Sequence, residues 1–161
     1  MTPLELQDKL QSLVAYDIPV FVSGDVGRSG ATFLRSTAGT GAEHLYYRVD
    51  VNSDTYSGQM LLLCGLHEVG HTHVEASEDL QGRIAQHRKV TIGMLENEAQ
   101  AWHWALDYCE RDGIYLEADT VRWIGVAFGS YIADLHWTAK GRARPDTNRL
   151  LTRLTTLADT C

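Results

Sequence analysis

The chain has 161 residues, and its 21 acidic against 14 basic side chains give a formal net charge of −7. A hydrophobic content of 44% and a charged content of 22% are typical of one globular domain. The acidic balance argues against general binding to nucleic-acid phosphates, so direct nucleic-acid binding is not expected. Residues 1–13 show no basic region followed by an apolar run, and no apolar stretch could span a bilayer. We therefore expect no signal peptide, no membrane partner and a cytoplasmic location.

The first half of the chain predicts one helix followed by short strands. Residues Leu4–Val14 have the apolar spacing of an amphipathic helix. Strands are expected at Val20–Val22, Ala31–Arg35 and His44–Val51, because β-branched and aromatic residues recur there and turn-forming residues separate the segments. This arrangement predicts a small, mostly antiparallel sheet of about three strands.

The second half of the chain predicts helices. The segment from about Tyr56 to about Val74 follows cap residues near Asn52, is apolar on nearly every side, and should form a buried central helix. Residues Glu75–Lys89 are polar and irregular. Further helices are expected at Thr91–Arg111, Ala118–Trp137 and Asp146–Ala158. A small sheet with about four to five helices makes an α+β domain over residues 1–161.

An HExxH sequence, His67-Glu68-Val69-Gly70-His71, lies inside the predicted central helix. Residues four apart share one face of a helix, so His67 and His71 can direct both imidazoles at one metal ion. Zinc binds such nitrogen ligands at about 2.0–2.1 Å. Glu68 is rotated by about 100° from His67, where its carboxylate can take a proton from a water that the metal activates. The pattern predicts a zinc centre with Glu68 as catalytic base, and Mn²⁺ or Co²⁺ could use the same ligands.

A catalytic zinc centre needs a third protein ligand and an open position for water. The downstream candidates are His73, Glu75, Glu96, Glu98 and His103. His73 points to nearly the opposite side of the helix from His71, and Glu75 reaches the correct face only if the helix continues.

Glu98 is the best of these candidates because it lies on the apolar face of the predicted helix Thr91–Arg111. That face also carries Ala101, Trp102 and Ala105. A carboxylate buried there needs a partner, which a metal ion would supply. Glu96 falls on the polar face and is interpreted as solvated. We therefore predict Glu98 as the third ligand.

The two motifs together resemble the gluzincin metallopeptidases and, more closely, the ImmA/IrrE family. The second motif of that family reads Glu-x-x-Ala-x-x-aromatic-Ala, which is similar to Glu98-Ala99-Gln100-Ala101-Trp102-His103-Trp104-Ala105 here. The resemblance covers about residues 44–109 and leaves 114–161 as a helical C-terminal extension. It implies a minimal gluzincin-type fold, Zn²⁺ held by His67, His71 and Glu98, and Glu68 as base. It also implies a small cytoplasmic peptidase, often one that cleaves a transcriptional repressor.

Gluzincins bind substrate as an added strand at a sheet edge beside the active-site helix. Residues His44–Val51 are the best candidate for this edge strand because they directly precede the helix, and an inner strand is the alternative interpretation. A donor that stabilises an oxyanion is also expected near the metal. The residue types that could provide it include Tyr46, Tyr47, Tyr131 and His136.

Other reactive or charged groups have plainer interpretations. The chain has 3 cysteines, an odd and sparse set that does not indicate a disulfide framework, and Cys64 is interpreted as a buried small apolar residue. A basic cluster is interpreted as a solvated face, with contact to an acidic protein or nucleic acid as the alternative. It comprises Lys140, Arg142, Arg144, Arg149 and Arg153. The apolar helix Ala118–Trp137 allows a homodimer, although packing in the core is the leading interpretation.

The sequence thus predicts a zinc-dependent peptidase that acts on a protein or peptide substrate. A non-catalytic regulatory or binding protein that keeps zinc for stability is the first rival, and in it Glu68→Gln would leave function intact. A mobile-element effector protease that acts on one host protein is the second rival. A repressor gene beside this one would favour the regulatory peptidase.

Overall fold

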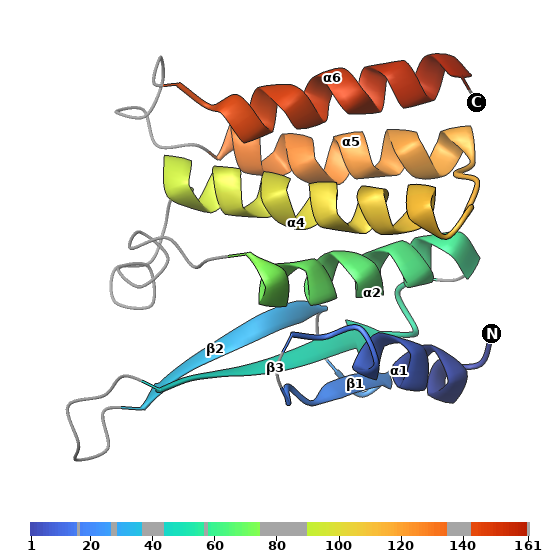
Figure 1. Cartoon of the computed structure of the whole chain (residues 1–161), viewed down its shortest axis with the longest axis vertical. Coiled ribbons are helices and arrows are strands. Elements are labelled where there is room, and N and C mark those ends of the chain that lie inside the picture. Colours follow the sequence, from blue (N-terminus) through green and yellow to red (C-terminus); the bar gives the residue numbers. More distant parts are fainter. Residues whose placement is uncertain are drawn as a thin grey trace. The chain divides into compact units, whose positions relative to one another are not determined.

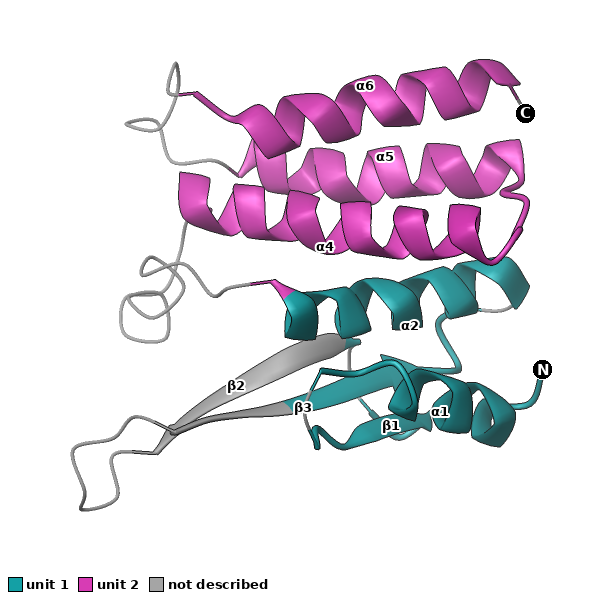
Figure 2. Ribbon diagram, in the orientation of Figure 1, with its two compact units in different colours: residues 1–73 teal, residues 74–161 magenta. Residues whose placement is uncertain are grey.

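The computed structural model describes residues 1–15, 17–26, 29–36, 44–56, 58–74, 90–134 and 143–160, with residues 30–36 and 44–47 described by their backbone only. The chain divides into two compact units, Met1–His73 and Val74–Cys161 (Figure 2). Unit 1 contains α1 (Pro3–Gln11), β1 (Val20–Ser23), β2 (Gly30–Ser36), β3 (His44–Asn52) and α2 (Gly58–His73) (Figure 1). Unit 2 contains α4 (Ile92–Arg111), α5 (Ala118–Ala133) and α6 (Pro145–Thr160). The α+β class is confirmed, while one domain over residues 1–161 stays a prediction.

The sheet of unit 1 is mixed, which corrects the expected antiparallel arrangement. Its strand order is β1-β3-β2, with β1 parallel and β2 antiparallel to β3. The chain reverses between β1 and β2 and again between β2 and β3, so β1 and β3 run in the same direction. The two outer strands therefore pair with β3 from opposite sides, and β3 is the inner strand.

Helix α1 closes the outer edge of β1. Thr2 and Glu5 form a capping box in which the Thr2 amide donates to Glu5 Oε2 at 2.7 Å and the Glu5 amide donates to Thr2 Oγ1 at 3.3 Å. Side chains on the following turns reach the strand: the Val22 amide donates to Gln7 Oε1 at 3.0 Å and the Val20 amide to Gln11 Oε1 at 2.9 Å. The two glutamine oxygens accept from backbone donors that an exposed edge strand would leave open to another chain.

The core of unit 1 lies between one face of the sheet and its helices. Alternation along the strands turns Val20, Val22, Val49 and Val51 into this core, together with Leu6, Leu10, Leu63, Leu66 and Val69 from the helices. The other face of the sheet carries Phe21, which is 40% exposed and has the Arg48 guanidinium 4.4 Å from its ring centroid. Buried and exposed side chains therefore alternate along the strands, as expected for a sheet that is covered on one face.

Helix α2 is the buried central helix that the sequence predicted. Every residue from Leu63 to Thr72 is buried. Its start differs from the prediction, because Asn52 forms a turn instead of a helix cap: Asn52 Oδ1 accepts from the amides of Asp54 at 2.8 Å and Thr55 at 2.9 Å. The helix therefore begins at Gly58, whose φ of 57° lies in the left-handed region that glycine adopts most easily.

The described part of unit 2 comprises three helices that lie alongside one another (Figure 1). Thr91 caps α4, as its hydroxyl accepts from the Met94 amide at 3.3 Å. After α4, Gly113 has a φ of 65° and the Ile114 amide donates to the Cys109 carbonyl at 2.8 Å, which is the Schellman ending of a helix. Helix α5 ends at Ala133, earlier than the predicted Trp137. The core side chains are Met94, Leu95, Trp102, Leu106, Val121, Ile124, Phe128, Leu150 and Leu154.

No helix in the described part of the chain combines the length and apolar character needed to cross a membrane. The predicted irregular segment Glu75–Lys89 lies outside the described residues, as do Lys140 and Arg142 of the basic cluster.

Candidate metal centre

Two imidazoles converge on the buried part of α2. His67 Nε2 and His71 Nε2 lie 3.2 Å apart, and the ring centroids are 4.6 Å apart with an interplanar angle of 73°. Both side chains belong to residues that are only 7% exposed. Their spacing of four residues places them one above the other on the helix, as the sequence predicted.

The separation of these two nitrogens suits two ligands of one ion. Metal–nitrogen bonds of about 2.0–2.1 Å at a tetrahedral angle place neighbouring ligand atoms about 3.3–3.4 Å apart. The observed separation of 3.2 Å between the two nitrogens is slightly shorter, and a small rotation of either histidine side chain would remove the difference. The imidazole pair therefore fits a divalent metal without any rearrangement of the helix.

Glu98 joins the two histidines in a group of described residues that could hold a metal ion. One ligand atom from each of His67, His71 and Glu98 lies within 4.8 Å of the others. The histidines are buried and Glu98 is partly buried. Imidazole nitrogens with one carboxylate are the donors of catalytic zinc sites, although other divalent metals accept the same set.

Glu68 follows His67 directly and is 8% exposed. Its carboxylate influences two neighbours. Burial is the larger cause of the raised pKa of Cys64, and the negative charge of Glu68 raises this pKa further. The same charge contributes to the raised pKa of Tyr56, which is also chiefly due to burial. The carboxylate that the motif predicts as catalytic therefore lies near a buried thiol and a partly buried phenol.

Cys64 has the chemistry of a small apolar residue. It is 5% exposed, and burial followed by the charge of Glu68 raises its pKa to about 12, against the opposing effect of a hydrogen bond with Ser29. In the metal-free protein this thiol stays protonated at neutral pH, and Cys64 is not in the ligand group that His67, His71 and Glu98 form. The structure therefore supports the apolar interpretation of Cys64.

The remaining third-ligand candidates have other roles. His73 is exposed, and its Nε2 donates to the Leu13 carbonyl at 2.6 Å. Glu96, which the sequence placed in solvent, instead accepts hydrogen bonds from the start of α6. His103 is buried in unit 2 beside Asp146 and Arg149. Glu75 lies outside the described residues.

The expected substrate strand is corrected by the topology. Residues His44–Val51 belong to β3, which lies between β1 and β2 in the sheet; β2 pairs with residues 44–50, whereas β1 pairs with residues 49–52. The alternative interpretation, an inner strand, is the right one. Of the expected oxyanion donors, Tyr46 and Tyr47 have no described side chain and His136 lies outside the described residues, while Tyr131 is part-exposed on α5.

Sequence reasoning did not single out Tyr56, whose pKa is raised by burial first and then by the charges of Cys64 and Glu68. Its position just before the HExxH helix was the available signal. It was overlooked because the helix was expected to begin at that residue, two positions before its actual start at Gly58.

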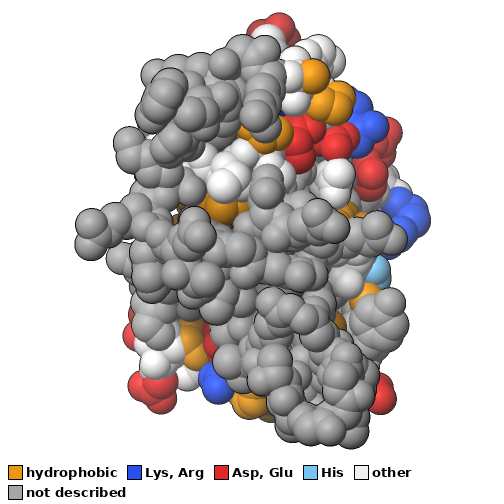
Figure 3. Space-filling view, turned by 90° about the vertical axis from the view of Figure 1, so that its left-hand side faces the viewer, with side chains coloured by type: hydrophobic (Ala, Val, Ile, Leu, Met, Phe, Trp, Pro, Cys, Tyr) orange, Lys and Arg blue, Asp and Glu red, His pale blue; other side chains and the backbone are white. Residues whose placement is uncertain are grey.

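Arginines of the predicted basic cluster face acidic groups of unit 2. Arg149 pairs with Asp146 at 3.1 Å, and Arg153 pairs with Asp107 at 2.5 Å and Glu110 at 3.1 Å. In Figure 3 the described basic side chains likewise lie close to acidic ones.

No family model, curated protein or solved structure matches this chain. The likeness to ImmA/IrrE peptidases therefore stays a prediction from the two motifs. What the structure adds to those motifs is a candidate His-His-Glu metal site compatible with an HExxH…E zinc centre.

Proposed function

We propose that this protein is a zinc-dependent peptidase. In this proposal His67, His71 and Glu98 bind the ion, Glu68 is the catalytic base, and the substrate is a specific cytoplasmic protein such as a repressor. The observation that carries the proposal is the 3.2 Å separation of the two Nε2 atoms on one buried helix turn, with Glu68 beside them.

The chemistry of the site follows from these residues. When bound, a divalent metal supplies Lewis acidity, which polarises a carbonyl and makes water a nucleophile near neutral pH. Glu68 would accept the proton of the attacking water and deliver a proton to the leaving amine. Burial of the carboxylate keeps bulk water away from this proton transfer and strengthens its electrostatic effect on the reacting groups.

The sheet suggests where an extended substrate would lie. Helix α2 contacts both β2 and β3. Because β3 is the inner strand and the glutamines of α1 occupy the edge of β1, β2 is the strand to which a peptide could add. In this proposal β2, in place of β3, is the strand that binds the substrate.

Metal analysis of purified protein tests the ligands. Wild type should bind one zinc ion per chain, and His71→Ala and Glu98→Ala should lose it. His73→Ala is the matched control, because His73 lies only two residues from His71 but is exposed and contacts a backbone carbonyl. Zinc retained in full by Glu98→Ala would mean that Glu98 is not the third ligand.

Hydrolysis of fluorescein-labelled casein tests the reaction. Glu68→Gln should keep the metal and lose cleavage by roughly a hundredfold or more, because proton transfer by a positioned side chain contributes about 10²–10⁴-fold. Cleavage that Glu68→Gln leaves unchanged would refute the assignment of the base. A zinc-loaded protein that cleaves neither casein nor a peptide library would favour the non-catalytic zinc protein.

A further inference from the structure

Helix α4 carries two glutamates that point in nearly opposite directions. Glu96 and Glu98 are two residues apart, which rotates their side chains by about 200° around the helix. Glu98 is the proposed metal ligand, whereas Glu96 faces α6. Any contact that holds Glu96 therefore also sets the direction in which Glu98 points.

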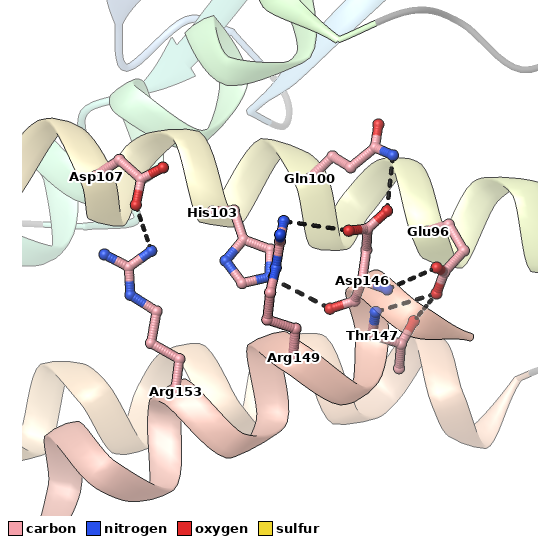
Figure 4. Close-up of polar contacts among 8 residues, drawn as sticks. All are labelled: Glu96, Gln100, His103, Asp107, Asp146, Thr147, Arg149 and Arg153. Carbon is pink, nitrogen blue, oxygen red and sulfur yellow. Dashed lines mark hydrogen bonds and ion pairs between the residues drawn. The ribbon is translucent and has the colours of Figure 1, made fainter. Parts of the chain in front are cut away.

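Glu96 is held by the first residues of α6 (Figure 4). Its Oε2 accepts from the Asp146 amide at 2.8 Å, and its Oε1 accepts from the Thr147 amide at 3.0 Å and from the Thr147 hydroxyl. These amides are at the N-terminus of a helix, where backbone donors lack intrahelical partners and the helix dipole favours a negative charge. The carboxylate of one helix thus caps another.

The contact extends along α4 as a polar stripe. Gln100, His103 and Asp107 follow Glu96 at helical spacing and face α6 in Figure 4. Gln100 Nε2 donates to Asp146 Oδ2 at 2.8 Å, Arg149 Nε donates to His103 Nε2 at 3.2 Å, and Arg153 donates to Asp107 at 2.5 Å.

The two ends of this stripe differ in burial. At the Glu96 end, Thr147 is only 1% exposed. At the far end, the side chains of Asp107 and Glu110 are 68% and 82% exposed, so their ion pairs with Arg153 are screened by water. The rigid part of the interface is therefore the part beside Glu98, and the weak part lies about 14–18 Å further along the helix.

We propose that α6 positions the metal ligand Glu98 by holding Glu96 and so fixing the rotation of α4. Glu96 is thus a positioning residue, and the C-terminal helix serves the metal centre without contributing a ligand. This inference rests on the proposed function, since it requires Glu98 to bind the ion.

The test is the zinc affinity of full-length variants, measured by competition with a chromophoric chelator. Glu96→Gln should weaken zinc binding roughly tenfold, as does loss of an outer group that orients a ligand. Thr147→Ala should weaken it roughly threefold, because changes remote from a ligand alter binding by modest amounts. Thr147→Ala changes no charge, so its effect separates positioning from the electrostatic loss in Glu96→Gln.

Glu110→Gln is the matched control, because it removes the same charge at the exposed end of the same interface and should leave zinc affinity unchanged. The visible spectrum of Co²⁺-loaded protein provides a second readout, since it reports the geometry of the ligands. The spectra of Glu96→Gln and Thr147→Ala should differ from that of wild type in band position and intensity. A purely structural role would lower the melting temperature without moving this spectrum.

Unchanged zinc affinity and Co²⁺ spectra in both variants would overturn the inference while the proposed function stood. Wild-type protein that binds no zinc, or Glu98→Ala that binds it fully, would instead refute the proposed ligands and the inference with them. Should Glu96→Gln fail to fold, Thr147→Ala decides the matter, because it leaves both glutamates in place.

Discussion

Replacing Glu96 with alanine should destabilise the protein far more than replacing an exposed glutamate of the same helix. The change removes the acceptor for the amides of Asp146 and Thr147 and for the Thr147 hydroxyl. Loss of a helix cap costs about 0.5–2 kcal/mol. Leaving the hydroxyl of the buried Thr147 without this acceptor adds about 1–3 kcal/mol.

Together these effects predict a loss of about 1.5–5 kcal/mol in the free energy of unfolding for Glu96→Ala. For a chain of this size, that corresponds to a melting temperature lower by roughly 3–20 °C. Urea denaturation followed by tryptophan fluorescence measures the loss directly, since Trp102, Trp104 and Trp123 lie on α4 and α5.

The control for this measurement is Glu110→Ala. Glu110 pairs with Arg153 at 3.1 Å, but its side chain is 82% exposed, so its loss should cost less than about 1 kcal/mol. Equal losses in Glu96→Ala and Glu110→Ala would refute the reasoning, because they would show that the cap contributes no more than a solvated ion pair.

Three further predictions concern other parts of the chain. His103 has a pKa below its ordinary 6.5, chiefly because it is buried, so it is neutral in the folded state. The stability that neutral His103 contributes to metal-free protein is complete above about pH 6.5 and is lost as the pH falls toward the lowered pKa. His103→Gln should therefore reduce the difference between the urea midpoints measured at pH 7.5 and at pH 5.0. Gly65→Ala should destabilise by about 1–3 kcal/mol because its new methyl would lie 2.5 Å from a buried Leu10 methyl, whereas Gly125→Ala, with open space around it, should stabilise slightly in thermal melts. Cys64, with a pKa of about 12, should resist iodoacetamide at pH 8 until the protein is unfolded, and rapid labelling of native protein would contradict its burial.

The parts of the site that could be predicted are those set by local geometry. The spacing of His67 and His71 places two imidazoles on one helical face wherever that helix lies, and the apolar residues around them indicated burial. Glu98 was also predicted as a ligand from one helix, because a carboxylate among Ala101 and Trp102 on an apolar face calls for a partner.

The predictions failed where the environment of a residue depends on a second helix or strand that packs against its own. Glu96 stands on the polar side of α4, so amphipathic analysis placed it in solvent, but α6 covers that side with polar groups of its own. Similarly, β3 reads as an edge strand from its place next to α2, whereas the sheet order makes it the inner strand.

The sequence by itself determined the helices, the strands and the imidazole pair, because hydrophobic periodicity and helical spacing act over a few neighbouring residues. Only the tertiary structure decided the sheet order, the capping of α6 by Glu96 and the burial of His103. Glu96 and Thr147 are 51 residues apart in the sequence, and no local pattern shows which polar face of one helix will meet the amides at the start of another.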